Sequence, residues 1–215
     1  MQTAQESKFA SIILKKNSKI YTRNKSRIGF SLLFLFGLAL GIFVFFIGFP
    51  NEAKINGDHI SKHLSSVFVE HETLSNCFIK TLKLSKTDIT HILFIFISGF
   101  TYFCCAMLGM IVFAKGFMLG FSLMFISKVS ADIASFDPIV FFWIFTLSKL
   151  LICAITVILS SETYMFSYDF RAIKQSCSVL KRAPVTYKFI FVFIRTVGAS
   201  LLINFIYCCA LKLLN

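Results

Sequence analysis

One apolar stretch constrains the fold of this chain more than any other feature of its sequence. Residues 28–49 include no charged side chain, and Pro50 follows them directly. The hydrocarbon core of a bilayer is about 30 Å thick and an α-helix rises about 1.5 Å per residue, so roughly 20 apolar residues are enough to cross it. Because unpaired backbone groups cannot face lipid, this stretch predicts a membrane-spanning α-helix.

The composition extends this prediction to a polytopic, all-α membrane protein. Hydrophobic residues make up 57% of the 215 residues, whereas a soluble domain is about 45–50% apolar. They are gathered into long runs that a soluble core of this size has no room to bury. We therefore predict a single membrane domain over residues 28–215 with about five transmembrane helices. The further spans are expected at residues 89–107, 109–126, 139–159 and 189–211.

The apolar run at residues 89–126 is too long for one span. Its only basic or acidic residues are His91 and Lys115. A single helix over this run would be about 57 Å long, nearly twice the hydrocarbon thickness. Two short spans joined by a minimal turn around Gly109 explain it better. A span followed by a re-entrant half-helix is the alternative.

The distribution of basic residues predicts the orientation. Residues 1–27 form a basic N-terminal arm with seven Lys and Arg, and residues 160–188 add five on the same side. The other side holds seven, in residues 51–88 and at Lys128 and Lys212. The positive-inside rule therefore places the N-terminus in the cytoplasm. A net charge of +12 would suggest nucleic-acid binding in a soluble protein. Here the basic residues crowd the ends of the spans, so membrane lipid is the expected partner, and not nucleic acid.

The polar segment between the first two spans, residues 51–88, has amphipathic patterning. Its apolar residues recur at helical spacing. This predicts one or two short amphipathic helices that lie on the extracytoplasmic membrane surface or pack on the bundle. A plain surface loop is the alternative. An apolar face of this kind offers a surface to a protein partner. The candidate partner-binding residues are Ile60, Leu64, Val67 and Phe68.

Lys149 lies at the middle of the span predicted at residues 139–159, where a lysine costs about 2.5–3.5 kcal/mol on insertion scales. Cys153, Thr156 and Ser160 share its helix face, so this polar face is expected to point into the bundle. No carboxylate falls within any predicted span. We therefore expect the partner of Lys149 to be a carbonyl, a hydroxyl, water or a group from another molecule. A functional and a purely structural role both stay open.

Other polar residues also interrupt the apolar runs. Lys115 and Arg195 each lie about 9 Å from the predicted cytoplasmic end of their span, and we expect both to snorkel to that surface. Asn204 shares a second polar helix face with Thr196 and Ser200. Glycine pairs at the spacing of close helix contacts are Gly37 with Gly41 and Gly116 with Gly120.

Motifs of catalysis and cofactor binding are missing from the sequence. It has no phosphate-binding glycine loop, no Gly-x-Ser-x-Gly elbow and no His-Glu-x-x-His pair. We predict no catalytic residue, no enzyme activity and no cofactor. His59 and His63 have the i, i+4 spacing of a zinc site, but we predict no metal site there. Cys77 and Cys177 are expected on opposite sides of the membrane, which argues against a structural disulfide.

Residues 113–121 read Phe-Ala-Lys-Gly-Phe-Met-Leu-Gly-Phe. This stretch resembles the Lys-Gly-Phe-x-x-Gly-Phe core of the stage II sporulation protein M family. The order of elements is similar too, with a basic arm, a glycine-bearing first span, an outer amphipathic segment, a close helix pair and two further spans. The family usually carries a proline in the turn before this core, whereas this chain has Leu108 and Gly109. The resemblance implies architectural positions at Lys115, Gly116, Phe117, Gly120 and Phe121.

The resemblance also implies a function. It suggests a non-catalytic protein of the bacterial cytoplasmic membrane that anchors peptidoglycan-degrading enzymes, an amidase and a lytic transglycosylase, at the septal membrane for forespore engulfment. The alternative is a small permease or the membrane subunit of a transporter, because polar helix faces and a mid-membrane lysine suit such a protein. The sequence leaves the formation of a homo-oligomer open.

Overall fold

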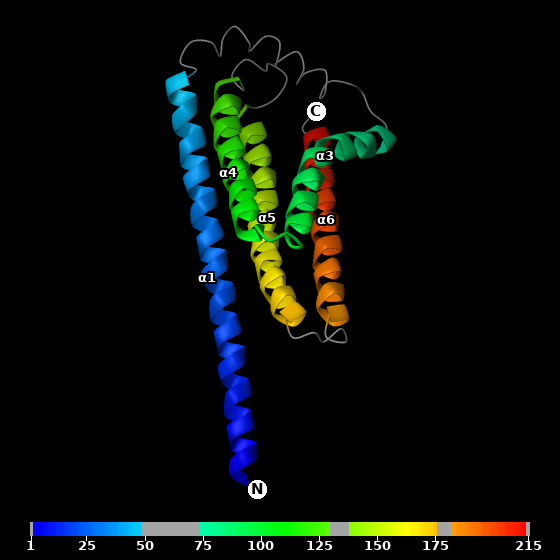
Figure 1. The fold of residues 1–215 in the computed structure, drawn as a ribbon. Coiled ribbons are helices and arrows are strands. Elements are labelled where there is room, and N and C mark those ends of the chain that lie inside the picture. The colour runs from blue at the N-terminus through cyan, green and yellow to red at the C-terminus, as the bar shows by residue number, and fades with distance from the viewer. Residues whose placement is uncertain (1, 49–73, 130–137, 176–181, 214–215) are drawn as a thin grey trace.

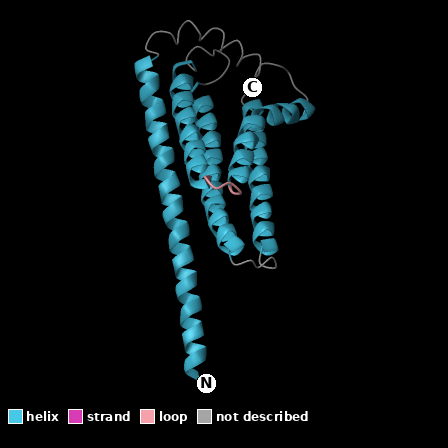
Figure 2. Ribbon diagram, viewed as in Figure 1, coloured by secondary structure: helices cyan, strands magenta, loops and turns pink. Residues whose placement is uncertain are grey.

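The computed structural model describes residues 2–48, 74–129, 138–175 and 182–213. These residues are all helical except for the turn at residues 99–103, and they include no strand (Figure 2). The all-α prediction is therefore confirmed. The helices, labelled as in Figure 1, are α1 (Gln2–Gly48), α3 (Leu74–Ser98), α4 (Cys104–Val129), α5 (Pro138–Gln175) and α6 (Arg182–Leu213).

Four of these helices are long and apolar enough to cross a membrane, which makes the chain a multi-pass membrane protein. The segments concerned are Tyr21–Gly48, Cys104–Ser127, Ile139–Ala172 and Pro184–Ala210. The remaining predicted span, residues 89–107, corresponds mainly to α3. The first 15 residues of α3 carry Lys80, Lys83, Lys86 and Asp88, so α3 is not among the four by length and composition.

The helices run alternately between the two ends of a bundle (Figure 1). The first turns of α3 project sideways at one end of the bundle, and the rest of α3 descends beside α6. The N-terminal part of α1 extends well beyond the opposite end. At about 1.5 Å per residue, the 47 residues of α1 make a helix of about 70 Å. The basic arm predicted at residues 1–27 is thus, from Gln2 onward, a helical extension of the first span.

The turn predicted around Gly109 is wrong, because the observed turn lies six to ten residues earlier. α3 ends at Ser98 and α4 begins at Cys104, so the break lies at residues 99–103. Gly109 lies inside α4, where a Cβ would be 3.3 Å from Leu33 Cδ2 of α1. The predicted spans 89–107 and 109–126 therefore shift toward the N-terminus, and α4 takes the residues assigned to the end of the first one.

Hydrogen bonding and packing explain the position of this turn. The backbone N–H groups of Gly99, Phe100 and Thr101 donate to carbonyl groups three residues earlier, at 3.0–3.2 Å, which tightens the end of α3. A Cβ on Gly99 would lie only 2.9 Å from Thr163 Cγ2 of α5. Glycine therefore lets the turn approach α5 closely. At Gly109 no tight turn or close approach of this kind requires a glycine.

The last two spans are longer than predicted. α5 continues 16 residues beyond the predicted span 139–159, because the polar side chains that follow Leu159 have partners. Ser161 hydroxyl lies 2.7 Å from Ser26 hydroxyl of α1, and Glu162 accepts a hydrogen bond from Arg27 of α1 at 2.8 Å. α6 likewise extends beyond the predicted span 189–211 at both ends.

Four glycines set the contact between α1 and α4. A Cβ on any of them would overlap a backbone carbonyl oxygen of the other helix, so no larger side chain fits without separating the two helices. The prediction that these glycine pairs allow close approach is confirmed. The contacts join Gly37 to Phe113, Gly41 to Phe117, Gly116 to Phe34 and Gly120 to Leu38.

An aromatic cluster closes the bundle near the turn. Phe166 of α5 stacks on Phe189 of α6, with ring centroids 4.0 Å apart, and Phe96 of α3 stacks on the same ring at 5.0 Å. Phe100 in the turn meets Phe166 edge-on at 5.2 Å. These contacts hold the end of α3 against α5 and α6. They therefore fix the position of every α3 residue along the axis of the bundle.

Candidate functional site

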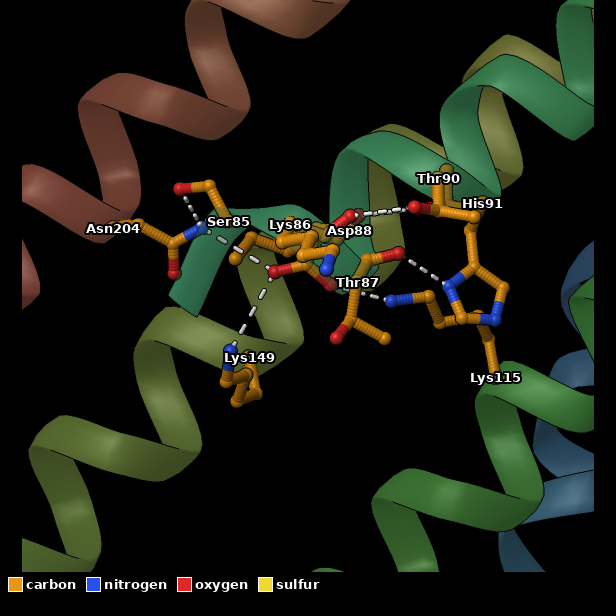
Figure 3. Close-up of polar contacts among 11 residues, drawn as sticks. Ser85, Lys86, Thr87, Asp88, Thr90, His91, Lys115, Lys149 and Asn204 are labelled. Carbon is orange, nitrogen blue, oxygen red and sulfur yellow. Dashed lines mark hydrogen bonds and ion pairs between the residues drawn. The ribbon is translucent and has the colours of Figure 1, made fainter. Parts of the chain in front are cut away.

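A buried charge cluster joins three helices inside the bundle. The Asp88 carboxylate of α3 lies between two ammonium groups (Figure 3). Lys115 Nζ of α4 is 2.5 Å from Asp88 Oδ1, and Lys149 Nζ of α5 is 3.6 Å from Asp88 Oδ2. The exposed fractions of the three side chains are 5% for Asp88, 11% for Lys115 and 23% for Lys149.

The register of α3 and α4 places this cluster deep in the bundle. Asp88 lies ten residues before the end of α3, and Lys115 lies eleven residues after the start of α4. These separations correspond to about 15–17 Å along each helix, roughly half the thickness of the hydrocarbon core. The cluster is therefore far from either end of the spanning helices.

The positions of both lysines correct the sequence predictions. Lys115 was expected to snorkel to the cytoplasmic surface, but its ammonium group turns to Asp88 and is buried. Lys149 was expected to have no carboxylate partner within the membrane, but Asp88 supplies one. Both errors have one cause: Asp88 was assigned to the outer polar segment, and the turn at residues 99–103 brings it into the bundle.

Helix α6 completes the cluster through Asn204. Its Nδ2 donates to Ser85 Oγ at 3.1 Å and to Asp88 Oδ2 at 3.3 Å. Asn204 and Ser200, one turn earlier on α6, are fully buried, and Thr196, two turns earlier, is also buried, which confirms that this polar face points inward. Asn204 Oδ1 and Ser200 Oγ find no partner in the described part of the chain.

The charges of the cluster do not balance. Two ammonium groups face one carboxylate, which leaves one positive charge in a largely apolar interior. A buried charge without a partner is costly, because the low dielectric of the interior does not replace its hydration. The closer lysine, Lys115, takes the hydrogen bond to Asp88. The excess charge therefore falls mainly on Lys149.

A cavity of about 340 Å³ adjoins the cluster, between α3, α4 and α5. On α3 its polar lining comes from Asp88 and from Lys83, Thr87 and His91, the last three at i, i+4 and i+8 on one helix face. Lys83 and Thr87 are exposed, whereas His91 is half-buried and its Nδ1 lies 2.7 Å from the Thr87 carbonyl oxygen. A polar wall thus leads from the exposed part of α3 toward the cluster. Further polar lining residues are Ser122 of α4 and Cys153 of α5.

The residues of 113–121 that were predicted to have architectural roles all take part in contacts between or along helices. Lys115 pairs with Asp88 of α3, and Gly116 and Gly120 contact the backbone of α1. Phe121 meets Phe45 of α1 edge-on, with centroids 5.3 Å apart, and stacks with Phe117 at 6.5 Å. The motif therefore joins α4 to two other helices.

Other predicted site residues lie apart from the cluster or outside the described residues. Arg195 is exposed on α6 and does not line the cavity. The partner-binding candidates Ile60, Leu64, Val67 and Phe68 and the histidine pair His59 and His63 fall outside the described residues. Within the described ranges, no group of three or more His, Cys, Asp or Glu side chains is placed to hold a metal ion.

A second polar cluster lies at the opposite end of the bundle from the start of α3. Glu162 of α5 pairs with Arg27 of α1 at 2.8 Å and with Arg23 at 3.5 Å. Arg171 of α5 donates hydrogen bonds to the Tyr102 carbonyl oxygen in the turn and to Ser167 hydroxyl, both at 3.0 Å. These contacts fasten α1 and the turn to the extension of α5.

Sequence reasoning missed Asp88, although a signal for it was present. Thr81, Ser85, Asp88, Ile92 and Ile95 recur at helical spacing, and all five are buried. These five residues lie on both sides of residue 88, where hydropathy had set the boundary between a polar loop and a span. Extending the helical pattern toward the N-terminus would have predicted one helix whose polar first part faces the bundle interior.

Comparison with protein-family models, with curated proteins and with solved structures finds no match for this chain. The functional interpretation therefore rests on its own residues.

Proposed function

We propose that this chain is a non-catalytic membrane scaffold, similar to stage II sporulation protein M, that anchors peptidoglycan-degrading enzymes at the septal membrane for forespore engulfment. The supporting observation is that residues 113–121 serve in packing helices together. Lys115 joins α4 to α3, and Gly116, Gly120 and Phe121 join it to α1. Phe117 stacks on Phe121 within α4 itself. A motif devoted to helix packing suits an architectural protein better than an enzyme.

The orientation follows from the basic residues. In this proposal the protein lies in the bacterial cytoplasmic membrane with the N-terminus of α1 in the cytoplasm. The segment that begins after Gly48 and the C-terminus are then extracytoplasmic. The partners are cell-wall hydrolases, an amidase and a lytic transglycosylase, which bind the apolar face of the outer segment around Ile60, Leu64 and Val67. The protein itself has no hydrolytic activity.

Deletion of the gene in its native host tests the scaffold function. The hydrolases should disperse from the septal membrane and engulfment should stop. Replacing Ile60, Leu64 and Val67 with Ser should weaken recruitment while leaving membrane insertion and protein level intact, because this change removes only the apolar face. The matched control replaces Ser61 and Ser65 of the same segment with Ala and should recruit normally. Normal engulfment in the deletion strain, with hydrolases in place, would refute the scaffold.

The cavity beside the charge cluster favours a second candidate, a small permease or the membrane subunit of a transporter. Intramembrane charges beside a cavity commonly mark the path of a solute. Purified protein in liposomes distinguishes the two candidates. Solute flux that depends on the protein, or co-purification with an ATPase or a solute-binding protein, supports the permease. Co-purification with cell-wall hydrolases supports the scaffold.

A further inference from the structure

The ammonium group of Lys149 has unused binding capacity. Its nearest described partner is Asp88 Oδ2 at 3.6 Å, which is an ion pair too long for a hydrogen bond. Asp88 meanwhile accepts a hydrogen bond from Lys115 at 2.5 Å and another from Asn204. An ammonium group carries three donors. Lys149 lines the cavity, and its side chain is 23% exposed, so these donors can reach a molecule inside it.

The charges around the cavity select an anion. Lys83, Lys115 and Lys149 line it together with Asp88, so three positive charges meet one negative charge. A bound cation would add to this excess, and a neutral molecule would leave the buried charge on Lys149 without a partner. An anion reduces the excess by pairing with Lys149, and the low dielectric of the surroundings strengthens their attraction.

The size and lining of the cavity restrict the anion further. About 340 Å³ is the volume of roughly ten water molecules, far more than one inorganic ion fills. Much of the wall is apolar, so a fully hydrated ion would lose hydrogen bonds there. The site therefore suits an anionic group attached to an apolar body. The apolar lining residues are Leu84, Met118, Leu119, Phe145 and Ile152.

We propose that this cavity binds a singly charged oxyanion carried on an apolar body, with the anionic group at Lys149 and the approach past Lys83. A medium-chain carboxylate and the phosphodiester of an anionic phospholipid share this chemistry. The inference is independent of the scaffold function, since it rests only on the contacts of Lys149 and on the walls of the cavity.

Thermal stability of the purified, full-length protein in a neutral detergent tests binding, because a ligand that binds the folded state raises the melting temperature. Hexanoate serves as the soluble probe and 1-hexanol as its uncharged control at equal ionic strength. The melting temperature should rise saturably with hexanoate and not with hexanol. Lys149→Met should abolish the rise. Lys86→Met, which removes an exposed lysine of α3 outside the cavity, should retain it.

A second arm distinguishes a lipid from a soluble ligand. The same variants are compared in nanodiscs of dioleoyl phosphatidylglycerol and of dioleoyl phosphatidylcholine. Stabilisation by phosphatidylglycerol that requires Lys149 assigns the site to an anionic lipid. A Lys149-dependent effect of hexanoate alone assigns it to a soluble carboxylate. If neither probe stabilises the protein, or if Lys149→Met keeps the full effect, the proposal is wrong.

Cys153 gives a test that leaves every charge in place, which covers the case that Lys149→Met does not fold. Cys153 lines the cavity one turn after Lys149. With the other six cysteines replaced by Ala, Cys153 should react faster with the anionic sulfonatoethyl methanethiosulfonate than with the cationic trimethylammonioethyl reagent. Hexanoate at ten times its Kd should slow the reaction about tenfold, and hexanol should not. Equal rates with both reagents, no protection, or no reaction at all would each overturn the anion site.

Discussion

Replacing Gly120 with Ala adds one methyl group at one of the closest contacts between α1 and α4. The new Cβ would overlap the Leu38 carbonyl oxygen and lie 3.1 Å from the Leu38 carbonyl carbon and 3.2 Å from Ile42 N. All three atoms belong to the backbone of α1, so no side chain can rotate away. An ordinary contact begins near 3.4 Å. The two helices must therefore separate by about 1 Å.

The cost of this separation has two opposing parts. Overpacking of a well-packed interior costs about 1–3 kcal/mol, and a gap of up to about 1 Å weakens the dispersion contacts of the neighbouring residues as well. Alanine favours the helix over glycine by roughly 1 kcal/mol. We expect Gly120→Ala to lower the free energy of unfolding by about 1–2 kcal/mol. Gly41→Ala pushes the same helices apart, so the double variant should lose less than the sum.

Unfolding of the detergent-solubilised protein by added dodecyl sulfate, followed by circular dichroism, measures these differences. The matched control is Gly198→Ala in α6, where a Cβ meets nothing within 4 Å. This control should be as stable as the wild type, or more stable by up to about 1 kcal/mol. If Gly120→Ala and Gly198→Ala have the same stability, the close contact between α1 and α4 does not exist as described.

Three further predictions concern topology and the polar contacts. In a chain without its other cysteines, Cys77 should label with an impermeant reagent in intact cells and Cys177 should not, because the basic residues place the N-terminus in the cytoplasm; the reverse pattern would refute this orientation. Asp88→Ala should cost about 3–5 kcal/mol in the same unfolding assay, because it leaves two buried lysines facing each other. Adding Lys115→Met should restore part of this loss, and failure to do so would show that the charges are not coupled. Arg171→Met removes exposed hydrogen bonds to the turn, so its loss of stability should stay below about 1 kcal/mol.

Hydropathy could predict that the chain is helical and where four long apolar helices lie, but it could not predict where the helices end. Hydropathy averages over both faces of a helix, so it places a boundary where the mean polarity changes. α3 and α5 both continue through such a change, because their polar side chains face protein. Ser161 and Glu162 of α5 meet Ser26 and Arg27 of α1, for example, and so belong to a helix that hydropathy would end at Leu159.

For a related reason, only part of the candidate site could be predicted from the sequence. Lys149 and Asn204 stood out because a polar residue within an apolar span is costly and therefore conspicuous. Asp88, which pairs with or accepts from both, was hidden among other polar residues. No spacing along the chain relates Asp88 to Lys149 or Asn204, because the pairing depends on the position of α3 along the axis of the bundle.

The sequence by itself determined that this chain is a multi-span helical membrane protein, because the length and apolarity of its runs leave no other way to satisfy the backbone. It also determined which glycines allow close helix packing, through their four-residue spacing. Only the tertiary structure decided which polar groups meet inside the bundle. The turn at residues 99–103 and the aromatic contacts of Phe96 set the position of α3 along the bundle axis. That position brings one carboxylate between two lysines beside a cavity.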